Sequence, residues 1–101
     1  MKKKKYITRE KMLHHLLDLV IEINSLECRN QNVTDNKPTA FFEYSGHVSI
    51  LYIRICMNGW SKEVCSTKYY EMYFDKDNFS ISQYKGLCKE LEEIRDGIRA
   101  R

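Results

Sequence analysis

Two neighbouring runs of β-branched and aromatic residues in the middle of the chain restrict its fold more than any other feature. Residues 39–44 (TAFFEY) and 48–57 (VSILYIRICM) have the composition of strands. Between them, Ser45-Gly46-His47 predicts a tight reversal in which Gly46 supplies the backbone freedom. The two runs therefore predict a β-hairpin at the centre of the fold.

Side chains alternate in character along the second run. Its odd-numbered positions from residue 51 form one continuous apolar row of Leu51, Ile53, Ile55 and Met57. The other row is mixed and contains Val48, Ile50, Tyr52, Arg54 and Cys56. Because successive side chains of a strand point to opposite faces, we expect the first row to face helices and the second to be partly solvated.

A third strand is expected after a longer connection. Asn58-Gly59 is a strong reversal signal, because both residues tolerate positive φ. The residues that follow are less strand-like than residues 68–74, which we predict as the third strand. A two-residue hairpin with the third strand beginning at Trp60 is the alternative. The second run is the most apolar, so it is expected at the centre of a sheet with strand order 1-2-3.

Helical periodicity is found on both sides of the predicted strands. Thr8 is expected to cap a helix over residues 9–25, where apolar residues recur at helical spacing. Residues 27–38 are polar and end in proline, which predicts a loop. Ser80 and Gln83 match a capping box that opens a second helix, predicted to run to about residue 97. The order α-β-β-β-α predicts an α+β two-layer sandwich, with a three-stranded antiparallel sheet packed against two helices.

Length and charge are consistent with one small domain. The 101 residues are 43% apolar and 31% charged, which is typical of a soluble globular protein. Six lysines and arginines but one glutamate give the first eleven residues a charge of +5, so the remainder carries −2 of the net +3. We expect residues 1–7 to be a flexible basic tail and residues 8–101 to be a single α+β domain. Asp18 and Glu22 interrupt the most apolar N-terminal stretch, which argues against a signal peptide or membrane span and predicts a cytoplasmic protein.

Reactive side chains do not form a recognisable catalytic constellation. His47 with Cys56 or Cys65 has the residue types of a base and a nucleophile, but no nucleophile motif surrounds either cysteine. His14 and Asp18 share one helical face and lack a third ligand of suitable spacing. The four cysteines are too widely spaced for a zinc knuckle. The sequence therefore predicts no enzyme, no cofactor and no metal site.

Aromatic residues of the predicted sheet are the strongest functional signal. Seven tyrosines exceed what a core of this size needs, because each buried hydroxyl requires a partner. Tyrosine, tryptophan and arginine are enriched at protein interfaces. Three glutamates on the same strands and connection, Glu43, Glu63 and Glu71, favour a protein partner over a phosphate backbone. The predicted partner-binding residues are Tyr52, Arg54, Trp60, Lys62, Tyr69 and Tyr73.

Resemblances to known families also suggest a protein that acts by binding another protein. The segment FFEYSGHVSILYIRI, followed by NGW and YYEMYFD, resembles small accessory proteins encoded by phages and prophages of Gram-positive bacteria. The layout is also similar to compact anti-CRISPR inhibitors of Cas9, although many of those are acidic and this chain carries +3. Double-stranded RNA-binding domains share the element order, but their last helix opens with a lysine cluster, where this chain has Lys85 alone.

The leading hypothesis is a non-enzymatic, phage-type accessory protein that binds and inhibits a host protein. The resemblance implies an anti-CRISPR or other anti-defence factor, with a defence nuclease such as Cas9 as the partner. The alternative is a small nucleic-acid-binding module that uses the lysine tail and the aromatic sheet face, with strong salt dependence. A homodimer is left open, because an outer strand with an uncovered edge invites pairing with a copy.

Overall fold

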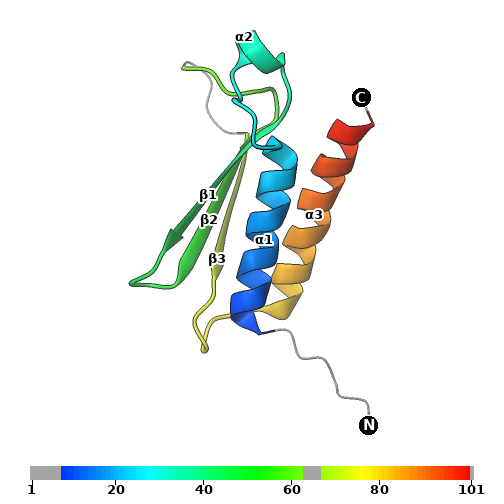
Figure 1. Cartoon of the computed structure of the whole chain (residues 1–101). Helices are drawn as coiled ribbons and strands as arrows, with labels where there is room; N and C mark the ends of the chain where they lie inside the picture. Colours follow the sequence, from blue (N-terminus) through cyan, green and yellow to red (C-terminus); the bar gives the residue numbers. More distant parts are fainter. Residues whose placement is uncertain (1–7, 63–66, 101) are drawn as a thin grey trace.

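Both long helices lie on one face of a three-stranded antiparallel sheet (Figure 1). The computed structural model describes residues 8–62 and 67–100, without the side chains of residues 33 and 34. The α-β-β-β-α order and the strand order β1-β2-β3 are as predicted. The elements are α1 (Arg9–Asn24), α2 (Gln31–Thr34), β1 (Thr39–Ser45), β2 (Ile50–Cys56), β3 (Lys68–Tyr73) and α3 (Ile81–Arg99). The predicted tail, residues 1–7, lies outside the described residues.

Helix α1 begins with the cap that its sequence predicts and ends at a left-handed residue. The Thr8 hydroxyl accepts a hydrogen bond from the backbone N–H of Lys11 at 3.1 Å, which satisfies one donor of the first turn. At the other end Ser25 takes a left-handed conformation with φ 56°, and its N–H donates to the carbonyl of Ile21. The predicted helix over residues 9–25 is therefore confirmed to within one residue.

The β1–β2 hairpin differs from its prediction at the turn. Ser45 pairs with Ile50, so the turn has four residues, 46–49, and the second strand begins two residues later than Val48. Gly46 is not in the left-handed region, whereas Ser49 is, with φ 55°. The reason is tertiary: the carbonyl of Ser49 accepts from the N–H of Phe74 at 2.8 Å, a contact at the end of β3 that the local sequence does not reveal.

The connection after β2 is long, and β3 begins at Lys68. The predicted third strand is confirmed, and the alternative of a hairpin starting at Trp60 is wrong. Gly59 makes the reversal with φ 88°. A Cβ at Gly59 would lie 3.0 Å from Cγ of Gln31 and 3.2 Å from the backbone of Asn36, so the close approach of two segments also requires glycine.

The predicted loop over residues 27–38 contains one turn of helix, α2. The side chain of Asn30 caps it by accepting from the N–H of Asn32 at 2.9 Å. The backbone N–H of Gln31 donates to the carbonyl of Trp60 at 3.1 Å. The Gln31 side chain donates to the carbonyl of Asn58 at 2.9 Å. These bonds to the connection after β2 stabilise a turn that is too short to be stable alone.

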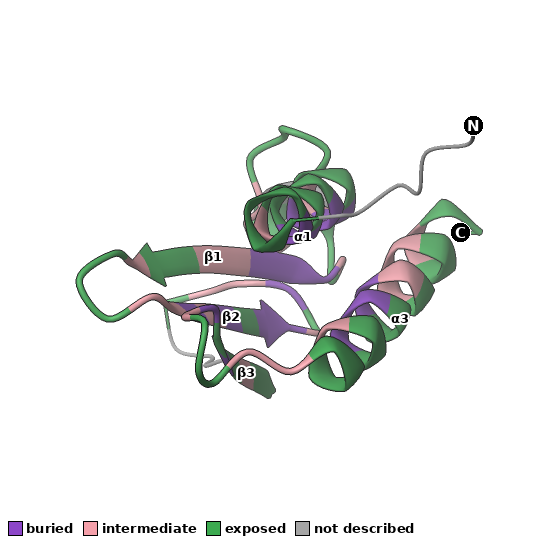
Figure 2. Cartoon of the chain, turned by 90° about the horizontal axis from the view of Figure 1, so that it is seen from below, coloured by how far each residue is buried: buried purple, intermediate pink, exposed green. Residues whose placement is uncertain are grey.

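The core lies between the helices and the covered face of the sheet (Figure 2). The apolar row of β2 is buried as predicted for Leu51, Ile53 and Ile55, each at most 1% exposed. Cys56 belongs to the row predicted to be partly solvated and is nevertheless 1% exposed. It is the last residue of β2, at the end of the sheet near α2 (Figure 1). The largest fully buried side chains are Leu16, Leu19, Ile23, Leu51, Ile53, Ile55, Met72, Leu91 and Cys56.

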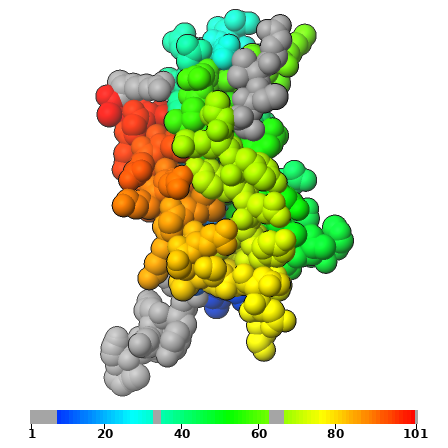
Figure 3. Space-filling view, turned by 180° about the vertical axis from the view of Figure 1, so that it is seen from behind, coloured from blue at the N-terminus to red at the C-terminus, as the bar shows by residue number. Residues whose placement is uncertain are grey.

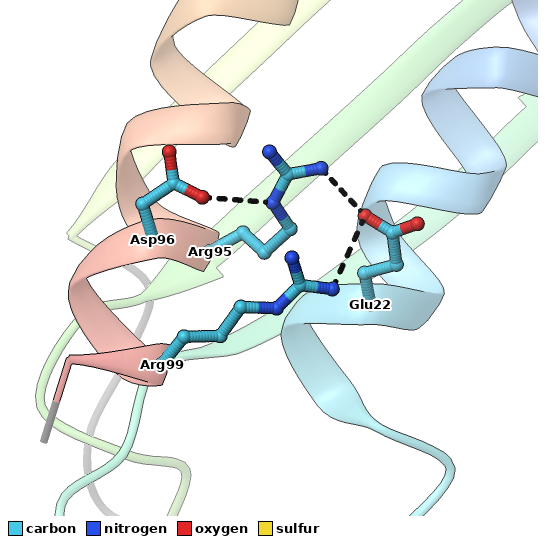
Figure 4. Close-up of polar contacts among 4 residues, drawn as sticks. All are labelled: Glu22, Arg95, Asp96 and Arg99. Atoms are coloured by element: carbon cyan, nitrogen blue, oxygen red, sulfur yellow. Dashed lines mark hydrogen bonds and ion pairs between the residues drawn. The ribbon is translucent and has the colours of Figure 1, made fainter.

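Helix α3 is fixed to the sheet at its start and to α1 near its end. Ser80 caps the helix by accepting from the N–H of Gln83 at 3.2 Å, which is half of the predicted capping box. In the other half of the box the Gln83 side chain would bond to the backbone N–H of Ser80. Instead, its amide donates to the carbonyl of Glu71 in β3 at 3.2 Å. Arg95 of α3 binds Glu22 of α1 at 2.7 Å, and α3 ends at Arg99 rather than near residue 97 (Figure 4).

Candidate functional site

The face of the sheet opposite the helices carries aromatic and charged side chains. Its residues alternate along each strand with those that face the helices, and the strand pairing arranges them in three rows across the sheet. We call this surface the open face. Its rows are Phe41–Arg54–Tyr69, Glu43–Tyr52–Glu71 and Ser45–Ile50–Tyr73.

Two aromatic contacts order the centre of the open face. The rings of Tyr52 and Tyr69 stack with centroids 6.3 Å apart and an interplanar angle of 28°. The guanidinium carbon of Arg54 lies 4.5 Å from the centroid of the Phe41 ring, within the range of a cation–π interaction. These contacts preorganise four neighbouring side chains that protrude from two adjacent rows.

Arg54 is exposed, and its charge is not neutralised by an ion pair within the described residues. Its guanidinium group lies over the Phe41 ring and is exposed, so it is accessible to another molecule. An arginine fixed in this way can donate two parallel hydrogen bonds to a carboxylate or a row of carbonyls on another molecule. This is the most specific recognition group on the open face.

Two carboxylates flank the same centre. Glu43 and Glu71 are the direct cross-strand neighbours of Tyr52, one on each outer strand. Partial desolvation, followed by the charge of Glu71, raises the pKa of the Tyr69 hydroxyl, so this exposed side chain stays neutral and able to donate. The open face therefore combines one cation, two anions and neutral aromatic rings within three rows.

Four of the six predicted partner-binding residues lie together on the open face: Tyr52, Arg54, Tyr69 and Tyr73. Trp60 and Lys62 lie in the connection after β2, where they line a surface pocket with residues 30–32 at the start of α2. The structure thus places the six residues in two groups.

Sequence reasoning missed Phe41 and the position of Glu43 as parts of the same surface. The alternation of β1 alone does not reveal them, because Phe41 and Phe42 are adjacent and both aromatic. Only the register, in which Phe41 pairs with Arg54 and Phe42 with Ile53, separates the ring on the open face from the one packed against the core.

The residues considered for cysteine chemistry are far from forming a pair. His47 is exposed in the four-residue turn, whereas Cys56 is buried at the opposite end of β2. Cys65 lies outside the described residues. Burial raises the pKa of the Cys88 thiol, which opposes formation of a reactive thiolate there.

The two histidines of α1 are exposed, and His15 contacts the ring of Tyr84 edge-on with centroids 6.5 Å apart. Over residues 8–62 and 67–100, no group of three or more His, Cys, Asp or Glu side chains is arranged to hold a metal ion. In the same part of the chain no helix has the length and apolar character needed to cross a membrane.

Comparisons of the chain with protein-family models, with curated proteins and with solved structures found no match.

Proposed function

We propose that this protein is a non-enzymatic binding module that docks another protein on the open face of its sheet. The observation that carries the proposal is the exposed Arg54 in cation–π contact with Phe41, beside the stacked Tyr52 and Tyr69. Side chains already ordered by their neighbours lose little conformational entropy on binding. Tyrosine and arginine are also the types that contribute most to protein interfaces.

The distribution of charge supports a protein partner rather than a nucleic acid. Glu43 and Glu71 lie on both sides of Tyr52, in the centre of the surface on which bases would stack. Carboxylates in these positions repel a phosphate backbone, whereas they match lysine or arginine side chains of a protein. The nucleic-acid alternative depends on residues 2–5, which lie outside the described residues.

The resemblance to phage accessory proteins and anti-CRISPR inhibitors gives the proposal a narrower form. In this form the partner is a host defence nuclease such as Cas9, and binding inhibits it by covering a surface that it needs. The chain contributes shape and contacts, and none of its groups takes part in a reaction.

The test compares two variants of the full chain. The double substitution Arg54→Ala with Tyr69→Ala removes the centre of the open face, and Asp18→Ala alters an exposed position on α1, in the helix layer. We expect wild type and Asp18→Ala to retain one host protein at a stoichiometric level, with at least tenfold weaker retention by the double variant. The magnitude follows from about 1.4 kcal/mol, a modest hot-spot contribution. Purified Cas9 tests the narrower form directly.

Two results would contradict the proposal. Equal binding by the double variant and the Asp18→Ala control would remove the open face from the interface. Recovery of nucleic acid in place of a protein, with affinity that falls steeply as salt is raised, would favour the alternative instead.

A further inference from the structure

Each edge of the sheet is bound by a helix side chain at one residue. On β3, Gln83 donates to the outward carbonyl of Glu71, and α3 lies alongside the strand (Figure 3). On β1, the side chain of Asn24 binds both backbone groups of Ala40, with Nδ2 to the carbonyl at 2.8 Å and the Ala40 N–H to Oδ1 at 2.9 Å. The Asn24 amide therefore occupies the place of a neighbouring strand, but at one residue only.

The bonds of Ala40 reveal which other groups of β1 point outward. In an antiparallel ladder, backbone groups alternate between facing the partner strand and facing away from it. Because the groups of Ala40 face away from β2, those of Phe42 and Tyr44 do so as well. No hydrogen bond from another segment in the described part of the chain reaches Phe42 or Tyr44. This half of the edge offers donors and acceptors at the spacing of an extended strand.

An apolar strip of α1 runs beside this edge. The strip consists of Leu13, Leu17 and Ile21, which are four residues apart. Asn24 follows three residues later on the same side of the helix. Asn24 is bound to Ala40 of β1, and Leu13 lines a surface pocket together with Tyr44. The strip therefore follows β1 from its start toward its end.

The middle of this strip is uncovered. Leu17 is 37% exposed and Ile21 is 38% exposed, although both lie between Leu13 and Asn24 on the helix. Figure 1 shows why: α1 and β1 diverge toward the end of the strand, where β1 continues into the hairpin turn. Figure 2 shows the same divergence, with the exposed half of β1 extending past the helix. A further strand beside β1 would cover both side chains.

We propose that the edge of β1 at Phe42 and Tyr44 accepts an extended segment of a partner protein as a fourth strand. The two partner residues opposite Phe42 and Tyr44 point to the helix side and pack near Leu17 and Ile21, so they are apolar. The residue between them lies on the open side, opposite Glu43, so charge complementarity selects lysine or arginine. The segment recognised is apolar–basic–apolar. This inference goes beyond the function proposed for the open face and shares only Glu43 with it.

A second copy of β1 fits this edge poorly. The antiparallel register that pairs Phe42 of one copy with Tyr44 of the other sets Glu43 opposite Glu43, and like charges in that position are destabilising. The register that sets Phe42 opposite itself places Tyr44 against Ala40, whose backbone groups Asn24 already binds. The register that sets Tyr44 opposite itself places Phe42 against Gly46, which lies in the turn beyond the end of the strand. The occupant is therefore a different chain with a basic central residue.

The test uses the acetylated and amidated peptide Thr-Thr-Val-Lys-Val-Thr-Thr with the full chain. Amide resonances followed by NMR should shift at Phe42 and Tyr44, and their hydrogen exchange should slow, because both N–H groups become bonded. Methylation of the backbone nitrogens of both valines removes the N–H donors that face β1 and should abolish binding. Methylation of the backbone nitrogen of the lysine, whose N–H faces away from β1, should leave binding intact.

A charge exchange checks the register. Glu43→Lys should lower the affinity for the lysine peptide by up to about fivefold, which corresponds to the free energy of one cross-strand pair. A peptide with glutamate in the central position should recover affinity for Glu43→Lys. Equal binding of the two methylated peptides, or shifts confined to other strands, would overturn the proposal. So would a dimer by sedimentation in which Phe42 and Tyr44 are protected without peptide, because a second copy would then be the occupant.

Discussion

The two faces of the same sheet differ in the character of their side chains and in how far those side chains are buried. On the covered face Leu51, Ile53 and Ile55 are at most 1% exposed, while on the open face Tyr69 is 54% exposed and Tyr73 40% exposed. Residues of both faces come from the same strands and are adjacent in sequence. The helix layer makes the difference: it removes one row of side chains from water and leaves the other to interact with a partner.

The largest expected effect contrasts neighbouring residues of β2. Ile53→Ala should lower the free energy of unfolding by about 3–4 kcal/mol, because it leaves a cavity in a fully buried position. Tyr52→Ala, on the open face, should cost about 1 kcal/mol or less, from the lost cross-strand contacts. Urea unfolding measures both. Similar losses in the two variants would break the distinction between the faces.

A second contrast concerns the two glycines at opposite ends of β2. Gly59→Ala should destabilise by about 2 kcal/mol, because φ 88° and close contacts with Gln31 and Asn36 both oppose a Cβ. Gly46→Ala should change stability by no more than about 0.5 kcal/mol, since a Cβ there meets nothing within 4 Å. Thermal unfolding at one pH compares them. A larger loss at Gly46 would contradict the turn geometry.

The third prediction tests the closed part of the β1 edge. Asn24→Ala should cost about 1–2 kcal/mol, because it leaves the backbone groups of Ala40 without their two side-chain bonds. Asn24→Asp keeps the side-chain acceptor and loses the donor. Its loss of stability near neutral pH should therefore lie between zero and that of Asn24→Ala. Amide hydrogen exchange at Ala40 should accelerate in Asn24→Ala. Unchanged exchange there would show that the amide is not essential to this edge.

The smallest expected effect depends on pH. Burial, followed by the hydrogen bond to Glu90, raises the pKa of Tyr70 well above its usual value of 10.0. The neutral form is thus favoured in the folded state, so stability is complete below pH 10 and declines as pH rises above it. Tyr70→Phe should cost about 1 kcal/mol at pH 7 and flatten this alkaline decline.

Tyr73→Phe is the matched control for the pH dependence, since Tyr73 is exposed on the open face. Unfolding measured from pH 8 to pH 11 should show the full alkaline decline in Tyr73→Phe. A profile for Tyr70→Phe as steep as that of wild type would show that Tyr70 does not cause the decline.

Local sequence chemistry was sufficient to locate most elements. Thr8 and Ser80 marked the starts of the long helices because an N-cap hydroxyl acts within three residues of its own position. The apolar row of β2 identified the covered face of that strand, because the period of a strand is two. Tyr52, Arg54, Tyr69 and Tyr73 were predicted as partner-binding residues, and they share one face because their strands pair in register.

Contacts between distant segments decided the remaining features. The turn of α2 is held by hydrogen bonds to Asn58 and Trp60. The left-handed residue of the hairpin is Ser49, whose carbonyl accepts from Phe74. The side chain of Gln83 donates to the carbonyl of Glu71 in β3. The stacking of Arg54 on Phe41 and the open half of β1 depend on register and on the direction of α1. Interactions within a few residues specify which segments form helices and strands, so these could be predicted from the amino acids alone. Which side chains and backbone groups are left uncovered depends on packing between segments far apart in the chain, so it required the folded structure.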